Sequence, residues 1–200
     1  MEEEIKLLLP KKKPKTLGDI LKWHIKIFED CLKFELEKQI IESAIEKTNR
    51  MIREVKEYLK EEGRSKGAKL ALVKLNDILE KYKEKLGVTK LVIKWLHKTN
   101  EAIVGSVVKS CLGESEAREL YMKHKDYRPN ILHGTGWMVE YLAAKEQWDK
   151  GKAAFLTFGT FMDPAKVDLI ILPNSLDEPV ELGLDYDNLE KSLRSEDLSL

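Results

Sequence analysis

Apolar positions recur at helical spacing through most of the first 125 residues and change to short continuous runs after them. From residue 16 to residue 62, aliphatic and aromatic side chains are separated by three or four positions with charges between them, which predicts one long helix or two joined end to end. Gly63 and Gly67 mark its end. Further helices are predicted over 68–86, 89–112 and 114–125, with Gly113 as a break. No segment up to this point has the pattern of a strand.

The pattern changes after the polar loop at 126–130. Residues 134–151 predict a helix, and the side chains expected on its buried face are Trp137, Met138, Tyr141, Leu142 and Trp148. Three short aliphatic and aromatic runs at 153–161, 167–173 and 179–186 predict strands, and residues 188–195 predict a last helix. Together these patterns predict an α+β protein, with a helical region at 1–125 and a small α/β domain with a mixed sheet at 126–200.

The charge is balanced overall but distributed unevenly. Residues 1–130 hold 29 Lys and Arg against 22 acids, whereas residues 131–200 hold 6 against 13. This asymmetry favours a polyanion-binding half and an acidic or cation-binding half, although two ordinary solvated surfaces would give the same counts. The basic stretch at 11–15 is interrupted by Pro14 and should not be helical. It could contact phosphate, but we interpret it as a solvated tail.

Composition excludes several classes of protein. Cys31 and Cys111 are far apart, which argues against a disulfide framework or a structural zinc site. No apolar run approaches the roughly 20 residues that span a bilayer, so we expect no membrane partner and a soluble protein of the cytoplasm. The four histidines show no metal-ligand spacing. A charged fraction of 35%, rich in Lys and Glu, is typical of thermophiles.

Three acidic residues stand where neighbouring elements of the α/β domain are expected to meet. Glu140 lies in the predicted helix, Asp168 begins the second strand, and Glu181 lies in the third. A buried carboxylate is costly unless it is paired, hydrogen-bonded or bound to a metal. Converging carboxylates suit Mg²⁺ or Mn²⁺. Each acid taken alone is also consistent with a hydrated carboxylate at the end of an element.

This order of a helix with Gly136 and Glu140, a strand, a second strand starting at Asp168 and a third with Glu181 resembles the PD-(D/E)xK nuclease superfamily. It is most similar to archaeal Holliday-junction resolvases and nuclease-like proteins of archaeal viruses, over residues 134 to about 194. The resemblance implies a restriction-endonuclease-like domain and a metal-dependent, structure-selective DNA endonuclease. Asp168 would be the principal metal ligand, Glu181 the second ligand and Glu140 the helix acid.

One position departs from the pattern of this superfamily. Its catalytic lysine would stand at residue 183, where this chain has Gly183. Lys166 is a candidate replacement because it would share a strand face with Asp168. The alternative is a protein that keeps the nuclease fold but has lost catalytic activity.

A second hypothesis places nucleic-acid binding in the helical region. Residues 82–98 resemble a helix-turn-helix with its turn at Gly87, and Lys90, Lys94 and Lys98 would then contact DNA. An ordinary helical hairpin with Gly87 as its cap is the preferred interpretation. The alternative function is therefore a non-catalytic DNA-binding protein with a degenerate nuclease fold. A structural oligomer built on residues 16–62 is the third option, and that segment is also the predicted homodimer contact.

Overall fold

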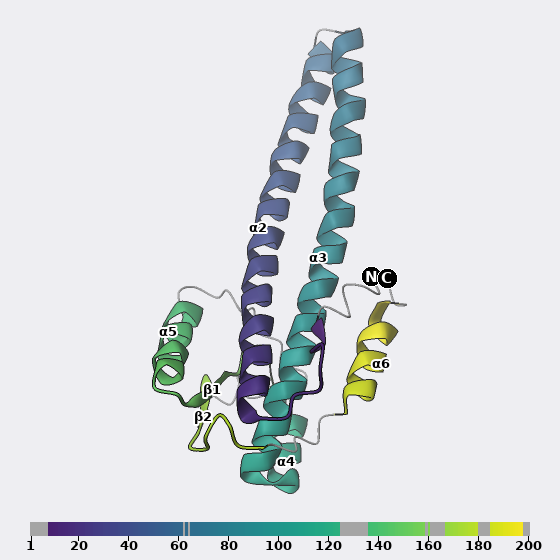
Figure 1. Ribbon diagram of the computed structural model, residues 1–200. Coiled ribbons are helices and arrows are strands. Elements are labelled where there is room, and N and C mark those ends of the chain that lie inside the picture. The colour runs from purple at the N-terminus through teal and green to yellow at the C-terminus, as the bar shows by residue number, and fades with distance from the viewer. Residues whose placement is uncertain are drawn as a thin grey trace. The chain divides into compact units, whose positions relative to one another are not determined.

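The computed structural model describes residues 8–61, 63, 65–124, 136–158, 160, 167–179 and 185–197. This part of the chain is mostly helical with a small two-stranded antiparallel sheet, in agreement with the broad α+β class predicted (Figure 1). The elements, in chain order, are α2 (Leu17–Glu61), α3 (Lys66–Leu112), α4 (Glu114–His124), α5 (Gly136–Asp149), β1 (Ala153–Leu156), β2 (Leu169–Leu172) and α6 (Tyr186–Asp197).

The chain divides into two compact units. The hairpin unit is Lys33–Val92, and the composite unit combines Met1–Leu32 with Ile93–Leu200. The boundary predicted at 125/126 does not coincide with this division. The reason is long-range packing: the rings of Phe28 and Phe158 lie 5.1 Å apart, and Ile170 packs against Val104 and Val108. The start of α2 and the end of α3 therefore belong with the sheet.

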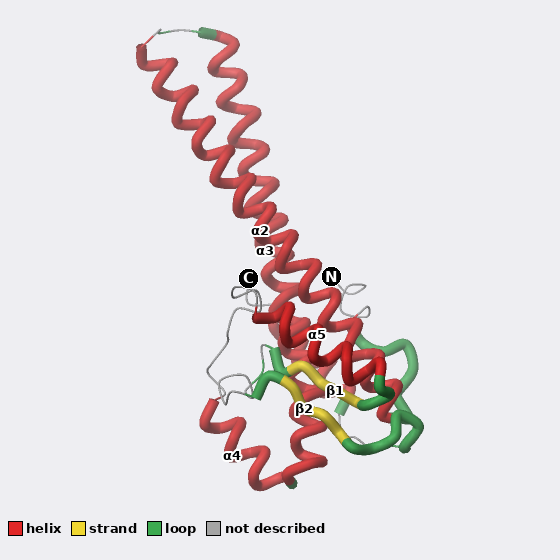
Figure 2. Tube along the Cα trace, turned by 90° about the vertical axis from the view of Figure 1, so that its left-hand side faces the viewer, coloured by secondary structure: helices red, strands yellow, loops and turns green. Residues whose placement is uncertain are grey.

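The hairpin unit consists of two antiparallel helical segments that run side by side in both views (Figures 1 and 2). Buried and half-buried side chains alternate at intervals of four and three residues, the heptad spacing of a coiled-coil seam. They are Ile41, Ile45, Thr48, Ile52, Val55 and Leu59 in α2 and Leu72, Leu75, Leu79, Tyr82, Leu86 and Thr89 in α3. Ion pairs link the helices, Lys85 to Glu37 at 2.7 Å and Lys90 to Glu42 at 3.7 Å. Of the two alternatives predicted for residues 16–62, one long helix or two joined end to end, the structure has the single helix α2.

Two expectations about glycines in this unit are wrong. Gly63 has a φ of +79° and follows α2 as predicted, but Gly67 lies inside α3. The helices predicted over 68–86 and 89–112 form one helix, so residues 82–98 contain no turn at Gly87. A mid-helix glycine costs only about 1 kcal/mol relative to alanine. The seam continues from Leu86 to Thr89, and its packing outweighs the cost of the glycine. The predicted helix-turn-helix is therefore absent from residues 82–98.

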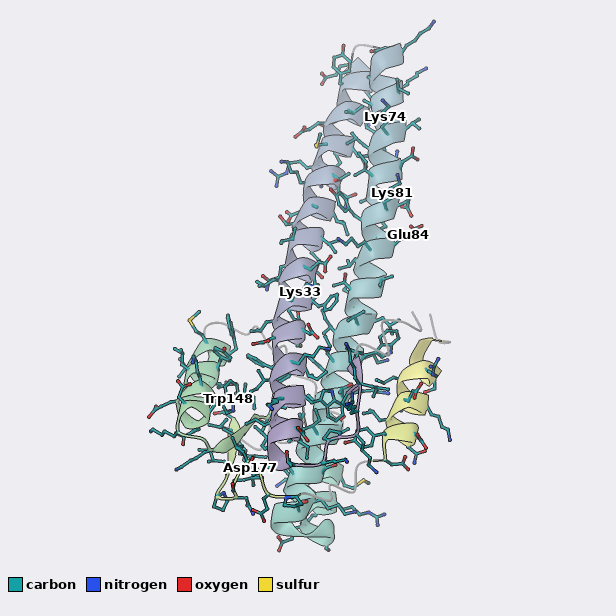
Figure 3. All side chains as sticks on the ribbon, in the orientation of Figure 1. Lys33, Lys74, Lys81, Glu84, Trp148 and Asp177 are labelled. Atoms are coloured by element: carbon teal, nitrogen blue, oxygen red, sulfur yellow. The ribbon has the colours of Figure 1, made fainter. Side chains whose placement is uncertain are left out.

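The sheet of the composite unit is shorter than the predicted strands. β1 pairs antiparallel with β2, from Ala153 opposite Leu172 to Leu156 opposite Leu169. All of β1 is buried, because α5 packs beside the sheet as well (Figure 2). Trp148 of α5 donates its Nε1 hydrogen to the Ala154 carbonyl at 2.8 Å (Figure 3).

The remaining predictions for the α/β part have mixed outcomes. Of the third predicted strand, residues 180–184 lie outside the described part, and α6 already begins at Tyr186. Pro179 forms only an isolated antiparallel bridge, with Thr16. In α5, Met138 and Leu142 are exposed rather than buried, and the fully buried residue is Ala144. α5 contacts the unit instead through the side that carries Tyr141, Ala144 and Trp148, and the Tyr141 ring stacks on Phe28 with 5.4 Å between centroids.

A buried polar network joins α2, α3 and β1. The Leu156 amide donates to His24 Nε2 at 2.9 Å, so Nε2 is unprotonated and Nδ1 donates to Asn100 Oδ1 at 2.8 Å. Asn100 Nδ2 in turn donates to the carbonyls of Leu156 and Phe158 at 3.3 and 3.0 Å. Burial lowers the pKa of His24 to about 4, which keeps the ring neutral. The network is satisfied and fixes the register of three elements.

Candidate functional site: a lysine-lined pocket

The acids predicted to bind metal are only partly covered by the structure. Glu140 is half-buried in the first part of α5, and a Cβ added at Gly136 would lie 3.7 Å from its Oε1. The carboxylate therefore turns back toward the N-terminus of its own helix, where the helix dipole favours a negative charge. Asp168 is exposed and directly precedes β2, and its carbonyl accepts a hydrogen bond from the Thr157 amide at 3.2 Å.

Glu181 and Lys166 lie outside the described residues, so the predicted triad is described only through Glu140 and Asp168. Within the described ranges, no group of three or more His, Cys, Asp or Glu residues is placed to hold a metal ion. The Mg²⁺ or Mn²⁺ site stays a prediction.

The three lysines predicted to bind DNA lie on α3, spaced four residues apart. Lys90 Nζ is 3.7 Å from Glu42 Oε1, and Lys98 Nζ contacts Ser192 Oγ at 3.5 Å. Lys94 also has a partner. Their role in DNA binding stays a prediction, and the pairing of Lys90 with Glu42 reduces the charge that this lysine offers to phosphate.

The start of the composite unit holds a more strongly basic feature. A pocket of about 720 Å³ is lined by Leu9, Pro10, Lys11, Lys12, Lys13, Pro14, Lys15, Asp19, Lys22, Trp23 and Lys26. We call it the lysine pocket: six of its side chains are lysines and one is an acid. One wall is the arm that precedes α2, and the other is the first three turns of that helix.

The arm is anchored to α2 by a capping interaction. Asp19 Oδ2 accepts hydrogen bonds from the amides of Lys15 and Thr16 at 3.1 and 3.3 Å, while Thr16 Oγ1 accepts one from the Asp19 amide at 3.2 Å. The hydrogen bond from Lys15 is the main cause that lowers the pKa of Asp19. The single acid of the pocket is thus engaged in holding the backbone of the arm.

The loop after β2 completes the cap of α2. The amides of Leu17 and Gly18 donate to the carbonyls of Glu178 and Leu176 at 3.1 and 2.8 Å. A Cβ at Gly18 would come within 3.1 Å of the Leu176 oxygen, so this close approach requires glycine. The amides at the start of α2, which have no partner within the helix, are therefore hydrogen-bonded by other parts of the chain.

Aromatic contacts hold the other end of the arm. Trp23 Nε1 donates to the Leu8 carbonyl at 2.8 Å, and the Trp23 ring stacks on Tyr186 of α6 with 5.8 Å between centroids. Lys13 Nζ lies 5.7 Å from the centre of the Tyr186 ring, within reach of a cation–π interaction. Burial raises the pKa of Tyr186. Residues 11–15 are thus held at both ends rather than forming a free tail, although the four lysines among them are exposed, as the interpretation as a solvated segment predicts.

The lysines of the pocket are mostly without counter-charges. In the described part of the chain, Lys11, Lys12 and Lys15 form no ion pair, Lys22 has only a weaker electrostatic interaction with Asp19, and Lys26 lies 3.6 Å from Asp30. Like charges gathered around a concave surface raise the local positive potential and attract anions. The pocket can therefore bind a phosphate-rich ligand.

An acidic pocket of about 530 Å³ adjoins the lysine pocket and shares Leu9, Pro10 and Lys13 with it. Its acids are Asp185, Asp187 and Glu190. Asp185 Oδ1 caps α6 by accepting from the Asn188 amide at 3.0 Å, and Glu190 pairs with Arg194 at 2.7 Å. A surface with three acids thus lies next to the lysine-lined one.

Sequence reasoning missed that Lys22, Trp23 and Lys26 belong with the basic arm. The available signal was Thr16 and Asp19 at capping-box spacing between the arm and two lysines four residues apart. None of the helices in the described part of the chain has the length and apolar character needed to span a bilayer. No protein-family model, curated protein or solved structure matches the chain.

Proposed function

We propose that the protein binds nucleic acid, with DNA as the expected polymer, and that the lysine pocket holds phosphates of its backbone. The observation that carries this proposal is the set of lysines without ion pairs, held around a concave surface by an anchored arm. Lysine contacts to phosphate are sequence-independent and release counterions, so binding should weaken steeply with salt.

A salt titration of binding to a labelled DNA tests this proposal. Replacing Lys11, Lys12 and Lys22 by Gln should lower affinity and reduce the slope of log K against log salt by about 2 to 3, because up to three phosphate contacts are lost. These lysines are exposed, so folding should be unaffected.

The matched control removes the same number of positive charges from another part of the chain. Lys33, Lys74 and Lys81 are exposed lysines of the hairpin unit that do not line the pocket (Figure 3). Their replacement by Gln should leave the slope nearly unchanged. Equal losses in the two triple variants would show that only net charge matters and would refute the assignment to the pocket.

A second candidate function is the metal-dependent DNA endonuclease, structure-selective in the manner of junction resolvases. It is supported by the order of elements: α5 with Glu140 directly precedes β1, and Asp168 stands at the entry to an antiparallel partner strand. That order is the one expected of a PD-(D/E)xK nuclease. In this proposal, Glu140, Asp168 and Glu181 hold Mg²⁺ or Mn²⁺, and Lys166 replaces the family lysine.

Cleavage of branched and linear DNA in the presence of Mg²⁺ or Mn²⁺ tests the endonuclease proposal. Asp168→Ala should abolish nicking, whereas Asp177→Ala should retain it, because Asp177 is an exposed acid of the loop after β2 with no proposed role in metal binding (Figure 3). If the unchanged protein binds DNA but does not nick it, the endonuclease proposal is refuted and only the DNA-binding function stands.

We also propose a homodimer formed through α2. Leu36, Ile40, Met51 and Tyr58 are between 43% and 70% exposed, and at 100° per residue they fall within about 60° on one side of the helix. Ile40→Lys should shift sedimentation toward the monomer, and a monomeric unchanged protein would refute the contact.

A further inference from the structure

The lysine pocket contains an apolar surface that phosphate binding does not explain. Leu9, Pro10, Pro14 and Trp23 line it together with the lysines. Trp23 is 6% exposed, its ring stacks on Tyr186 and its Nε1 hydrogen is donated to Leu8, so the apolar surface open to a ligand comes mainly from the half-buried Leu9, Pro10 and Pro14. A ligand that fits both surfaces must combine anionic groups with an apolar or aromatic portion.

Building on the proposed function, we infer that the pocket takes single-stranded nucleic acid in preference to duplex. In a single strand the bases are accessible, so phosphates can lie against Lys11, Lys12 and Lys22 while a base covers the apolar surface. In a duplex the bases are stacked inside and the sugar-phosphate backbone faces outward. A duplex would therefore contact the lysines and leave the apolar surface uncovered.

The dimensions of the pocket favour the same ligand. Its volume of about 720 Å³ falls within the range of small-molecule sites, which is the scale of one or two nucleotides. The lysines stand on two walls, the arm and α2. A thin strand can lie between two walls, whereas the wide convex surface of a duplex can approach only their edges.

The acidic pocket sets the side on which the strand binds. Asp185, Asp187 and Glu190 line the adjoining acidic pocket, which shares Lys13 with the lysine pocket. Phosphates are repelled by these carboxylates and attracted by the lysines of the lysine pocket. Because the apolar contact involves no hydrogen-bond donor from Trp23, binding should show little sequence preference.

Competition experiments with the full chain test this inference. A labelled single-stranded oligonucleotide is bound first, then displaced by an unlabelled single strand, a blunt duplex of equal length or an abasic single strand with the same phosphates. We expect the intact single strand to compete about tenfold or more better than the duplex, and several-fold better than the abasic strand because base contacts are lost. The Lys11, Lys12 and Lys22 triple variant should bind both the single strand and the duplex more weakly, because both contact the lysines, and the Lys33, Lys74 and Lys81 triple variant should bind as the unchanged protein does.

Each outcome distinguishes the inference from the function on which it rests. Equal competition by duplex and single strand would overturn the inference while leaving nucleic-acid binding intact. Equal competition by the abasic strand would also overturn it, because charge alone would then account for binding. Absence of binding to every DNA would refute the proposed function as well.

Discussion

The hairpin unit and the lysine pocket are both rich in lysine, but they place it differently. In the hairpin unit some lysines lie beside acids, as in the pairs of Lys85 with Glu37 and Lys83 with Glu80 at 2.7 and 2.8 Å. Others, such as Lys33, Lys74 and Lys81, form no ion pair in the described part of the chain and do not line the lysine pocket. In the pocket six lysines are gathered around one concave surface, and the backbone of the arm occupies Asp19. The concave arrangement of the lysines, rather than their number or their pairing, distinguishes a candidate binding surface from a solvated helix.

The two units also differ in how they are held together. The hairpin unit depends on a repeating seam of contacts, each of which resembles its neighbours. The composite unit depends on single contacts between residues far apart in sequence, such as His24 with Asn100. Loss of one seam contact should therefore be tolerated better than loss of one long-range polar contact.

The largest expected effect is on the buried polar network. Asn100→Leu would leave His24 Nδ1 and the carbonyls of Leu156 and Phe158 without partners, which should lower the free energy of unfolding by about 4 kcal/mol. Denaturant unfolding measures this loss.

The control for this variant is an asparagine of the hairpin unit. Asn76 is exposed and donates only to the Leu72 carbonyl of its own helix at 2.8 Å. Asn76→Leu should change stability by less than about 0.5 kcal/mol. Comparable losses in the two variants would contradict the contrast between the units.

The next effect is the pH dependence that His24 confers. Its pKa is about 4 in the folded protein and near 6.5 when exposed, so the unfolded chain binds the proton more readily. The contribution is fully present above pH 6.5 and is lost as the pH falls toward 4, by roughly 3 kcal/mol in total. Urea unfolding at several pH values measures it. His24→Gln should flatten the dependence of unfolding free energy on pH between pH 4 and 6.5. An unchanged pH dependence would show that other groups cause it.

The smallest effect concerns glycine in α3. Gly87 lies in the helix with nothing within 4 Å of an added Cβ, so Gly87→Ala should raise the melting temperature by stabilising the helix by about 1 kcal/mol. At Gly63 and Gly113, where φ is +79° and +89°, alanine should destabilise instead. If Gly87→Ala lowered the melting temperature, the turn predicted at Gly87 would be supported instead of the continuous helix.

Local patterns were sufficient to predict the helices but not the site. Heptad spacing marked the long helix, and Gly113 marked the break before α4, because both signals lie within a few residues. At Gly87 the local signal was misleading, since seam packing outweighed the preference of glycine for turns. The isolated His24 gave no signal, because its partner Asn100 is 76 residues away.

The basic arm was visible in the sequence, but its anchoring was not. Asp19 and Thr16 are local, whereas the Trp23 contact with Tyr186 joins segments from opposite ends of the chain. A run of lysines has the same composition whether it is solvated or held. Only the long-range contacts distinguish the two, and spacing along the chain does not encode them.

The close approach of Gly18 to Leu176 makes one stretch of backbone common to both candidate sites. Residues 168–179 carry Asp168 at one end and, at the other, the carbonyls that cap α2 beneath the arm. A displacement at either end is transmitted over about ten residues of chain. If both proposals hold, a strand seated among the lysines and a metal held at Asp168 would be mechanically coupled, so occupancy of one site would alter affinity at the other.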